Sequence, residues 1–286
     1  NFSGDGTMAS TNQLDHTVIN VKFDMDTAAP LFEALGFTLT PRGFHSTGSM
    51  NHLMMFGTDY LELIGLPEGA DHQRPDVAEA SLGINGIVFK SANVDAPYAH
   101  MQTVGVDGDP PKAFSRPVDM PGGAQDAKFR TVTSRGDAFP GGRVYFCEHA
   151  TPELVWQPQF QSHANEVTHM PEFVIVSEDA PAEAERFAKL LDTYIQDNGD
   201  SLTVPIDGCD LTVMAPAAYQ DRYGEFASPM NGRQGIFGAI VFGSNELGSL
   251  NERLEDAPAG VEAETDIIRT VVRIPGFDAV LEFIVG

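Results

Sequence analysis

The sequence predicts an α+β fold in which tandem βαβββ modules form curved mixed sheets around a cleft, with four modules in two pairs. Three observations support this prediction. Residues 14–66 show strand-like and helix-like patterns in the order β-α-β-β-β. The same order recurs, less regularly, at 83–157, 170–216 and 236–286. A single module of this kind would leave sheet edges and an apolar face uncovered, so the modules are expected to pair.

The first module opens with a strand-like run, Leu14–Val21, that holds His16 near its start. A short amphipathic helix is expected at Thr27–Leu35. Asp26 precedes this helix and can accept hydrogen bonds from its first amides, whereas Gly36 follows it and can adopt the left-handed conformation. Three further strands are expected to complete the module, at 37–42, 51–56 and 60–66.

The last strand of the first module carries a carboxylate in an apolar setting. Glu62 lies between Leu61 and Leu63. Side chains alternate along a strand, so Glu62 points to the face opposite the two leucines. A charge at such a position is costly unless it is solvated, paired or bound to a metal. A solvated strand residue is the simpler alternative.

The second module can be laid on the first by a shift of 69 residues. Its first strand is expected at 84–89, where Asn85 falls opposite His16, and its helix is expected after Asp95. The segment 107–126 is rich in Pro, Gly and Asp, so we expect it to be irregular. Strands are expected at 128–133 and 143–149. The module is expected to close with Thr151–Trp156, which makes Glu153 the counterpart of Glu62.

The second half repeats the pattern in a shorter form. A strand at 173–176 precedes a helix at 181–191, for which Asp179 is the expected N-cap. Asp207-Gly208 predicts a hairpin between strands at 202–206 and 211–215. The segment 235–244 is similar to 83–91. A helix at 246–254 and strands at 267–274 and 279–285 complete the chain, and the last strand carries Glu282.

These patterns divide the chain into two module pairs, 8–167 and 168–286, and the second pair is the more degenerate. Residues 157–167 are polar and are expected to link the two pairs. We interpret residues 1–7 as a remnant of recombinant expression and Met8 as the natural start.

Composition limits the classes of function. The chain has 286 residues and a formal net charge of -24, so nucleic acid is not an expected partner. No run of apolar residues is long enough to cross a membrane. The two cysteines form no disulfide framework, which favours a reducing, cytoplasmic setting. We expect the partner to be a small-molecule substrate. The chain could be a monomer or a homodimer.

Several motifs resemble the vicinal-oxygen-chelate superfamily (glyoxalases, bleomycin-resistance proteins and extradiol dioxygenases) and, within it, the glyoxalase-like domain proteins. The resemblance covers roughly residues 14–167. It implies the paired-module fold, but it does not select a reaction, because the superfamily includes isomerases, lyases, dioxygenases, thiol transferases and metal-free binding proteins. The motifs are Leu14-Asp15-His16, 32–37, 48–53, 59–64, 146–156 and His163-Ala164-Asn165.

The resemblance also implies a divalent metal held by residues of the first and last strands of two paired modules. His16 and Glu62 match this pattern in the first module, and Glu153 is the candidate in the second. Asn85, or its neighbour Gly86, stands where a His is expected, and His149 is a substitute. Such ligands suit Mn, Fe, Ni, Co or Zn. The simpler alternatives are a structural His at a strand start and a loop carboxylate.

Other polar residues are candidates for catalysis or substrate binding. Glu153, His45 and His52 are candidate proton carriers, although histidines are also common in surface loops. Asn51 and His149 are candidate substrate ligands. Arg116 and Arg130 could hold an anionic substrate bidentately, or could pair with acidic residues of this chain.

Two functions follow from the resemblance. The first is a metal-dependent enzyme acting on a small oxygenated metabolite, with a lyase or isomerase favoured over a dioxygenase. The alternative is a metal-free binding or resistance protein, which the absence of a His at Asn85 favours. No second metal centre is expected in 168–286, because no His follows His169.

Overall fold

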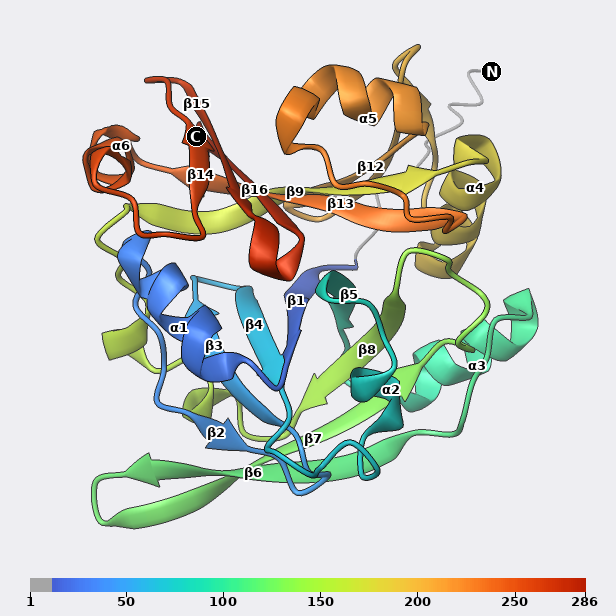
Figure 1. Ribbon diagram of the computed structural model, residues 1–286. Helices are drawn as coiled ribbons and strands as arrows, with labels where there is room; N and C mark the ends of the chain where they lie inside the picture. Colours follow the sequence, from blue (N-terminus) through green and yellow to red (C-terminus); the bar gives the residue numbers. More distant parts are fainter. Residues whose placement is uncertain (1–11) are drawn as a thin grey trace, which may run out of the picture.

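The computed structural model describes residues 12–286 and consists of two halves, one stacked on the other (Figure 1). Each half is built on one eight-stranded mixed sheet. Residues 1–7 and Met8, which the sequence suggests are an expression remnant and the natural start, lie outside the described residues.

The first sheet contains all strands between Leu14 and His149. Its strand order is β2-β3-β4-β1-β5-β8-β7-β6. The strands are β1 (Leu14–Lys22), β2 (Gly43–Phe44), β3 (Met50–Met55), β4 (Tyr60–Gly65), β5 (Gly83–Lys90), β6 (Lys112–Met120), β7 (Gly123–Thr133) and β8 (Arg143–His149), and the helices of this half are α1 (Met25–Ala34), α2 (Pro75–Ala78) and α3 (Asp95–Val104).

The second sheet repeats this order, as β10-β11-β12-β9-β13-β16-β15-β14. None of the helices in residues 12–286 has the length and apolar character needed to cross a membrane. The strands are β9 (Val167–Ser177), β10 (Gln196–Asp197), β11 (Leu202–Ile206), β12 (Cys209–Met214), β13 (Gly235–Ser244), β14 (Glu262–Glu264), β15 (Arg269–Ile274) and β16 (Ala279–Val285), and the helices are α4 (Ala180–Leu191), α5 (Pro216–Tyr223) and α6 (Gly248–Glu255).

Strand pairing confirms the prediction of four βαβββ modules in two pairs. In each module the first strand is parallel to the last, as in β1 with β4 and β5 with β8. The first strands of paired modules are antiparallel, as in β1 with β5 and β9 with β13. The parallel neighbours need a helix-containing connection, which the module supplies.

The first sheet curls until its two edges meet. The backbone amide of Ser46, which follows β2, donates to the carbonyl oxygen of Ser115 on β6 at 2.8 Å. The amide of Ser115 donates in turn to the Ser46 hydroxyl at 3.1 Å. We call this contact the seam. Because it closes the sheet into a barrel, the concave face is enclosed and its polar residues are buried.

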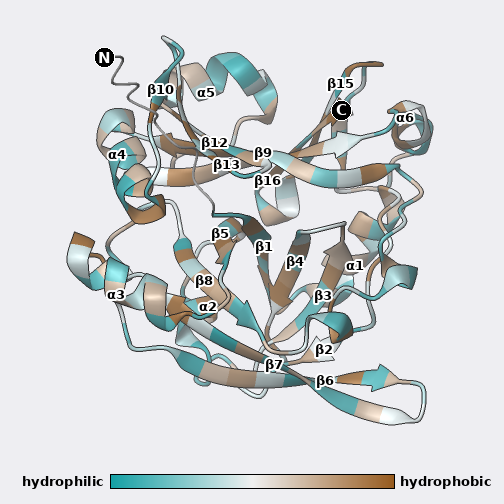
Figure 2. Ribbon diagram, turned by 180° about the vertical axis from the view of Figure 1, so that it is seen from behind, coloured by the Kyte–Doolittle hydropathy of each residue, from teal (hydrophilic) through white to brown (hydrophobic). Residues whose placement is uncertain are grey.

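The two halves share one apolar core. Phe37, at the end of α1, lies 5.3 Å from Phe242 on β13 and 6.0 Å from Phe283 on β16, measured between ring centroids. Beyond the second sheet, α5 packs Tyr219 and Tyr223 onto an apolar cluster. Figure 2 shows α5 as largely hydrophilic, whereas the strands beneath it are hydrophobic. The first half therefore buries polar groups inside its sheet, and the second fills its concave face with a helix.

The predictions for residues 37–42 and 107–126 are wrong. Residues 37–42 form no strand, because Pro41 lacks an amide donor and the Thr38 amide bonds the His163 ring instead. Residues 107–126 are not irregular, because β6 and β7 form a long hairpin there. The Pro121-Gly122 pair that suggested a loop is the hairpin turn, and Gly122 has the positive φ of 94° that such a turn requires.

The predicted helix caps were partly correct. Asp179 caps α4, because its side chain accepts a hydrogen bond from the Ala182 amide at 3.2 Å. Asp26 and Asp95 lie inside the first turns of α1 and α3, so they are not N-caps. The predicted helix end at Gly36 is correct, since this residue has a φ of 90°, and Gly105 ends α3 in the same way with a φ of 77°.

A buried carboxyl between the halves makes stability depend on pH. Asp59 accepts a hydrogen bond from the Met170 amide at 3.3 Å, while its Oδ1 atom has no partner. Burial raises the pKa of Asp59 to about 7 from its usual 3.8, although the Met170 amide opposes this effect. The folded state therefore holds a proton that the unfolded state has released, and its contribution is lost as pH rises from about 4 through 7.

We expect Asp59→Asn to be more stable than the wild type at pH 8 by on the order of 2–4 kcal/mol, and equally stable near pH 4. Denaturant unfolding at both pH values measures the difference. Asp200→Asn, at an exposed turn, is the control and should show no such pH dependence. A D59N variant that is destabilised at pH 8 would contradict this explanation.

Candidate functional site

A β-bulge directs two consecutive polar residues of β1 into the barrel. The β1–β5 register passes from Leu14 to His16, so Asp15 is the extra residue. Neighbouring side chains normally point to opposite faces, and the bulge removes this restriction. The Nδ1 atom of His16 lies 2.6 Å from an Asp15 carboxylate oxygen, which leaves Nε2 directed towards the interior.

The second buried carboxylate, Glu62 of β4, lies between two imidazoles. Its Oε2 atom accepts a hydrogen bond from the Asn51 side-chain amide at 2.8 Å. His16 Nε2 lies 3.8 Å from Oε1, and His45 Nε2 lies 3.7 Å from Oε2. Both imidazole contacts are longer than a hydrogen bond, so neither ring is directly bonded to the carboxylate. The structure thus brings together four residues predicted for the site.

The charges in this cluster follow from its surroundings. Burial raises the pKa of Glu62, but the electrostatic attraction of the neighbouring His16 and His45 rings and the Asn51 hydrogen bond outweigh it, so the net pKa is lowered. Burial lowers the pKa of His45 to about 4, despite the opposing attraction of Glu62. At neutral pH, therefore, Glu62 is a carboxylate and His45 is uncharged.

Two tyrosines enclose His16. Tyr60 stacks on its ring with a centroid distance of 4.4 Å, and the Tyr145 hydroxyl lies 3.3 Å from Nε2. Burial raises the pKa of Tyr145, so its phenol stays protonated and can donate. The imidazole is thus held by Asp15 on one side and faces a hydroxyl and a carboxylate on the other.

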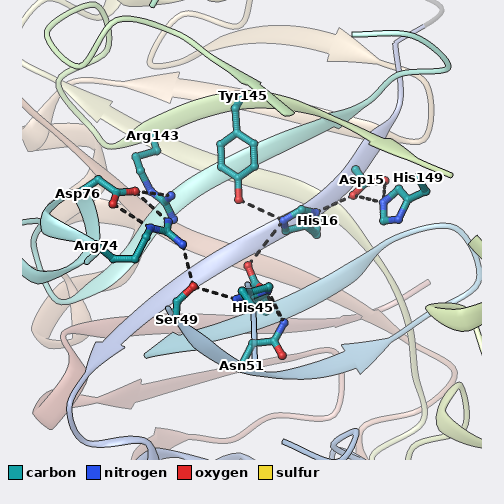
Figure 3. A network of polar contacts seen from close by, with 11 residues as sticks. Asp15, His16, His45, Ser49, Asn51, Arg74, Asp76, Arg143, Tyr145 and His149 are labelled. Atoms are coloured by element: carbon teal, nitrogen blue, oxygen red, sulfur yellow. Dashed lines mark hydrogen bonds and ion pairs between the residues drawn. The ribbon is translucent and has the colours of Figure 1, made fainter. Parts of the chain in front are cut away.

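Arginines extend the network towards α2, as Figure 3 shows. Arg74 donates to the Ser49 hydroxyl at 2.7 Å, and Ser49 in turn contacts His45 at 2.8 Å. Asp76 bonds both Arg74 and, at 3.5 Å, Arg143. The Nε and Nη2 atoms of Arg143 are buried without a partner. The network therefore includes guanidinium groups, and the charge of Arg143 contributes to the lowered pKa of Glu62.

A further group of ligand-type residues lies beyond Asp15. Among residues 12–286, Asp15, Cys147 and His149 have ligand atoms within 4.8 Å of one another. His149 Nε2 lies 2.9 Å from Asp15, and the Lys90 ammonium lies 3.0 Å from the other Asp15 oxygen. Burial raises the pKa of Cys147, so its thiol is protonated. Lys90 and the two histidines therefore already occupy the Asp15 oxygens.

The paired module does not supply the ligands expected for a four-ligand metal site. Asn85 is the extra residue of a bulge in β5, just as Asp15 is in β1, so the two strands correspond with a shift of 70 residues. Gly86 then corresponds to His16. Val18 pairs with Glu62, and Val88 pairs with Tyr145, so Tyr145 corresponds to Glu62.

Neither counterpart fits a metal. Gly86 has no side chain, and a Cβ atom there would lie 2.9 Å from the Cβ of Val18, which leaves no room for histidine. Tyr145 is a protonated phenol. The donors at the expected positions are therefore His16 and Glu62 alone, and this set does not fit the divalent metal site that the resemblance implies.

Three predicted site residues lie away from this cluster. Glu153 is exposed on a one-turn 3₁₀ helix after β8, so the predicted strand at Thr151–Trp156 and the correspondence with Glu62 are wrong. His52 follows Asn51 on β3 and points to the other face, where it contacts the Thr40 carbonyl at 2.7 Å. Arg130 pairs with Glu148 and Asp95 along an open groove of ≈ 500 Å³.

The remaining predicted residues lie inside the barrel or at its end. Arg116 is buried on β6, and His149 is bonded to Asp15. Sequence reasoning missed Arg74, Arg143 and Tyr145. Arg143, Tyr145 and Cys147 are alternate residues of β8 and so share one face of the strand. This pattern could have identified Arg143 and Tyr145. Arg74 lies in a connection whose position no local pattern predicts.

The second half buries a glutamate at the corresponding position but satisfies it internally. Glu282 pairs with Val241 of β13, as Glu62 pairs with Val18 of β1. Arg222 donates to Glu282 at 2.8 Å, Tyr223 donates at 2.7 Å, and Arg269 bonds the other oxygen. Because α5 supplies two of these donors, no open carboxylate remains there.

Comparison with protein families identifies one match. The profile of a glyoxalase-like domain matches residues 14–191, which is more than half of the chain. None of the curated proteins compared with the chain matches it.

Solved structures with the same fold cover nearly the whole chain. A hypothetical protein from Staphylococcus aureus has a TM-score of 0.67 at 11% identity, and the match covers 96% of this chain and 100% of that one. A mutant 4-hydroxymandelate synthase from Streptomyces coelicolor has a TM-score of 0.58 at 15% identity, and the match covers 97% of this chain and 93% of that one. A fusion of a xylose isomerase-like TIM barrel with 4-hydroxyphenylpyruvate dioxygenase has a TM-score of 0.58 at 13% identity, and the match covers 98% of this chain and 50% of that one. At such identities the likeness shows the fold alone.

The closed position at Gly86 is testable. We expect Gly86→Ala to destabilise the protein by about 1–3 kcal/mol, because its Cβ would overlap Val18. Gly57→Ala is the matched control, since a Cβ there meets nothing within 4 Å, and its effect should stay within about 0.5 kcal/mol. Denaturant unfolding measures both. Equal stabilities of the two variants would show that position 86 has room for a side chain.

Proposed function

The chain belongs to the glyoxalase-like domain family, and we propose that it is an enzyme that moves a proton on a small oxygenated metabolite inside the first barrel. The proposal favours an isomerase or lyase reaction over oxygenation. The observation that carries it is the Glu62 carboxylate, which lies 3.8 Å and 3.7 Å from two imidazoles without bonding either directly. A carboxylate and imidazoles held in this way form a set of proton acceptors and donors.

His16 is the proposed base. Its Nδ1 bond to Asp15 fixes the ring and favours the tautomer whose lone pair is on Nε2. That nitrogen faces the interior, so it can remove a proton from carbon next to a substrate carbonyl. Tyr145, which is protonated because burial raises its pKa, supplies a donor to the substrate oxygen as negative charge develops there.

Glu62 and His45 complete the proposed proton path. The ionised Glu62 stabilises the imidazolium that His16 becomes, in the role that a buried carboxylate plays beside a catalytic histidine. His45 is neutral, so it can carry a proton between Glu62 and the Ser49 hydroxyl, which it contacts at 2.8 Å. The proposed reaction uses side chains of this chain and no step through a metal.

A metal-dependent enzyme is the second candidate, and the group of Asp15, Cys147 and His149 favours it. Sulfur, nitrogen and oxygen donors together suit zinc or a neighbouring divalent metal such as Mn, Fe, Co or Ni. Lys90 counts against it, because its ammonium already neutralises Asp15 at 3.0 Å. Elemental analysis of wild type, Cys147→Ser and Cys209→Ser separates the candidates: bound metal that is lost only in C147S supports the second.

The first candidate predicts proton exchange without metal. We expect chelator-treated protein to exchange the α-hydrogens of at least one small 2-oxo acid or hydroxyketone for deuterium in D₂O, measured by proton NMR. His16→Gln and Glu62→Gln should each slow this exchange by about 10²-fold or more.

His52→Gln is the matched control, because this histidine lies on the other face of β3 and should leave exchange unchanged. Exchange that persists in H16Q, or that appears only when a divalent metal is added, would refute the proposed mechanism.

A further inference from the structure

Arg116 is a buried cation without a partner. Its exposed fraction is 6%, and within residues 12–286 no hydrogen bond or ion pair joins its guanidinium to another group. Its buried Nε donor is unsatisfied. In a protein with a net charge of -24, carboxylates are abundant, and Arg74, Arg130 and Arg143 all have one. An unpaired charge at this depth is costly, so its retention needs a reason.

The side chain of Arg116 reaches across the seam. It starts on β6 and passes over Gly43 of β2, where a Cβ atom would lie 2.6 Å from its Cδ and 3.1 Å from its Nη1. The same Cβ would lie 2.6 Å from Asn51 Oδ1, so the guanidinium group ends beside the residue that bonds Glu62. Because Gly43 has no side chain, Arg116 of β6 can pass over β2 and reach the site.

Glu62 is a carboxylate whose charge acts on Arg116, but no ion pair joins the two. Burial lowers the pKa of Arg116, and only the fields of Tyr60 and Glu62 oppose this. The Glu62 carboxylate is surrounded by His16, His45 and Asn51 instead. The unpartnered buried donors of Arg116 and Arg143 require an acceptor that residues 12–286 do not supply.

We propose that Arg116 binds an oxyanion of the ligand, a carboxylate or a phosphate group, and that this contact holds the seam closed. The inference rests on the proposed small-molecule site and adds the charge class of its ligand. Because the site is buried, the ligand enters when β6 separates from Ser46 and its neighbours. Among the described residues, two hydrogen bonds between Ser46 and Ser115 join the edges at the seam. A bound anion adds a further contact between β6 and the opposite edge.

The experiment compares thermal unfolding of wild type, Arg116→Gln, Arg116→Lys and Arg130→Gln. The probes are pyruvate, acetate and inorganic phosphate, with sodium chloride at matched ionic strength. We expect at least one probe to raise the melting temperature of wild type and R130Q by about 2–4 °C near saturation, and none to do so for R116Q. Pyruvate or acetate identifies a carboxylate site, and phosphate alone identifies a phosphate site. R116K should keep a reduced shift, since it retains charge without the planar fork.

Without a probe, R116Q should melt at or above the wild-type temperature, because an uncompensated buried charge has been removed. Hydrogen exchange at the amides of Ser46 and Ser115 should slow when the effective anion binds wild type. The inference is overturned if no probe stabilises wild type, or if R116Q responds as wild type does. It is also overturned if R116Q melts well below wild type while R116K does not. Loss of deuterium exchange in H16Q is independent of these shifts, so the failure of either proposal is recognisable.

Discussion

The first half is organised by the cost of burying the Glu62 carboxylate. A charge in the middle of a strand, inside a closed barrel, must be stabilised by groups that come from elsewhere in the chain. Asn51 donates to it directly, whereas His16 and His45 remain 3.8 Å and 3.7 Å away. The bulge at Asp15, the seam at Ser46 and the position of Arg116 all determine what can approach this carboxylate.

The two halves satisfy the same constraint differently. In the second half α5 and β15 supply Arg222, Tyr223 and Arg269, which bond Glu282 at close range and leave it with no further capacity. In the first half the carboxylate has imidazole neighbours and unpartnered guanidinium donors nearby. The second half thus contains a closed ionic core, and the first half contains an open arrangement of acids and bases. The function that we propose is located in the first half.

Family membership and fold similarity establish how the polypeptide is arranged, but they leave the chemistry to the individual side chains. The positions that carry metal ligands in the pattern of the superfamily are occupied here by His16, Glu62, Gly86 and Tyr145. Gly86 lies too close to Val18 to be replaced by a ligand. The chain has the carboxylate and one imidazole of that pattern, together with Tyr145, His45 and three arginines. This set is the basis of our proposal that the protein transfers a proton on an anionic metabolite.

Local sequence patterns determined the four-module order and most strand positions, because periodicity and turn residues act over a few neighbours. The resemblance to glyoxalase-like proteins, rather than any local pattern, implied that His16 and Glu62 share a site. Tertiary structure decided the rest. The single-residue bulges at Asp15 and Asn85 set the register that makes Gly86 and Tyr145 the counterparts of His16 and Glu62. The expectation of a closing strand at 151–156 led to Glu153 instead. Arg116 meets the site only because the sheet curls and its edges join, whereas Arg74 comes from the connection before α2 and Arg143 from β8. Such contacts depend on strand pairing across 50 or more residues, which no local pattern encodes.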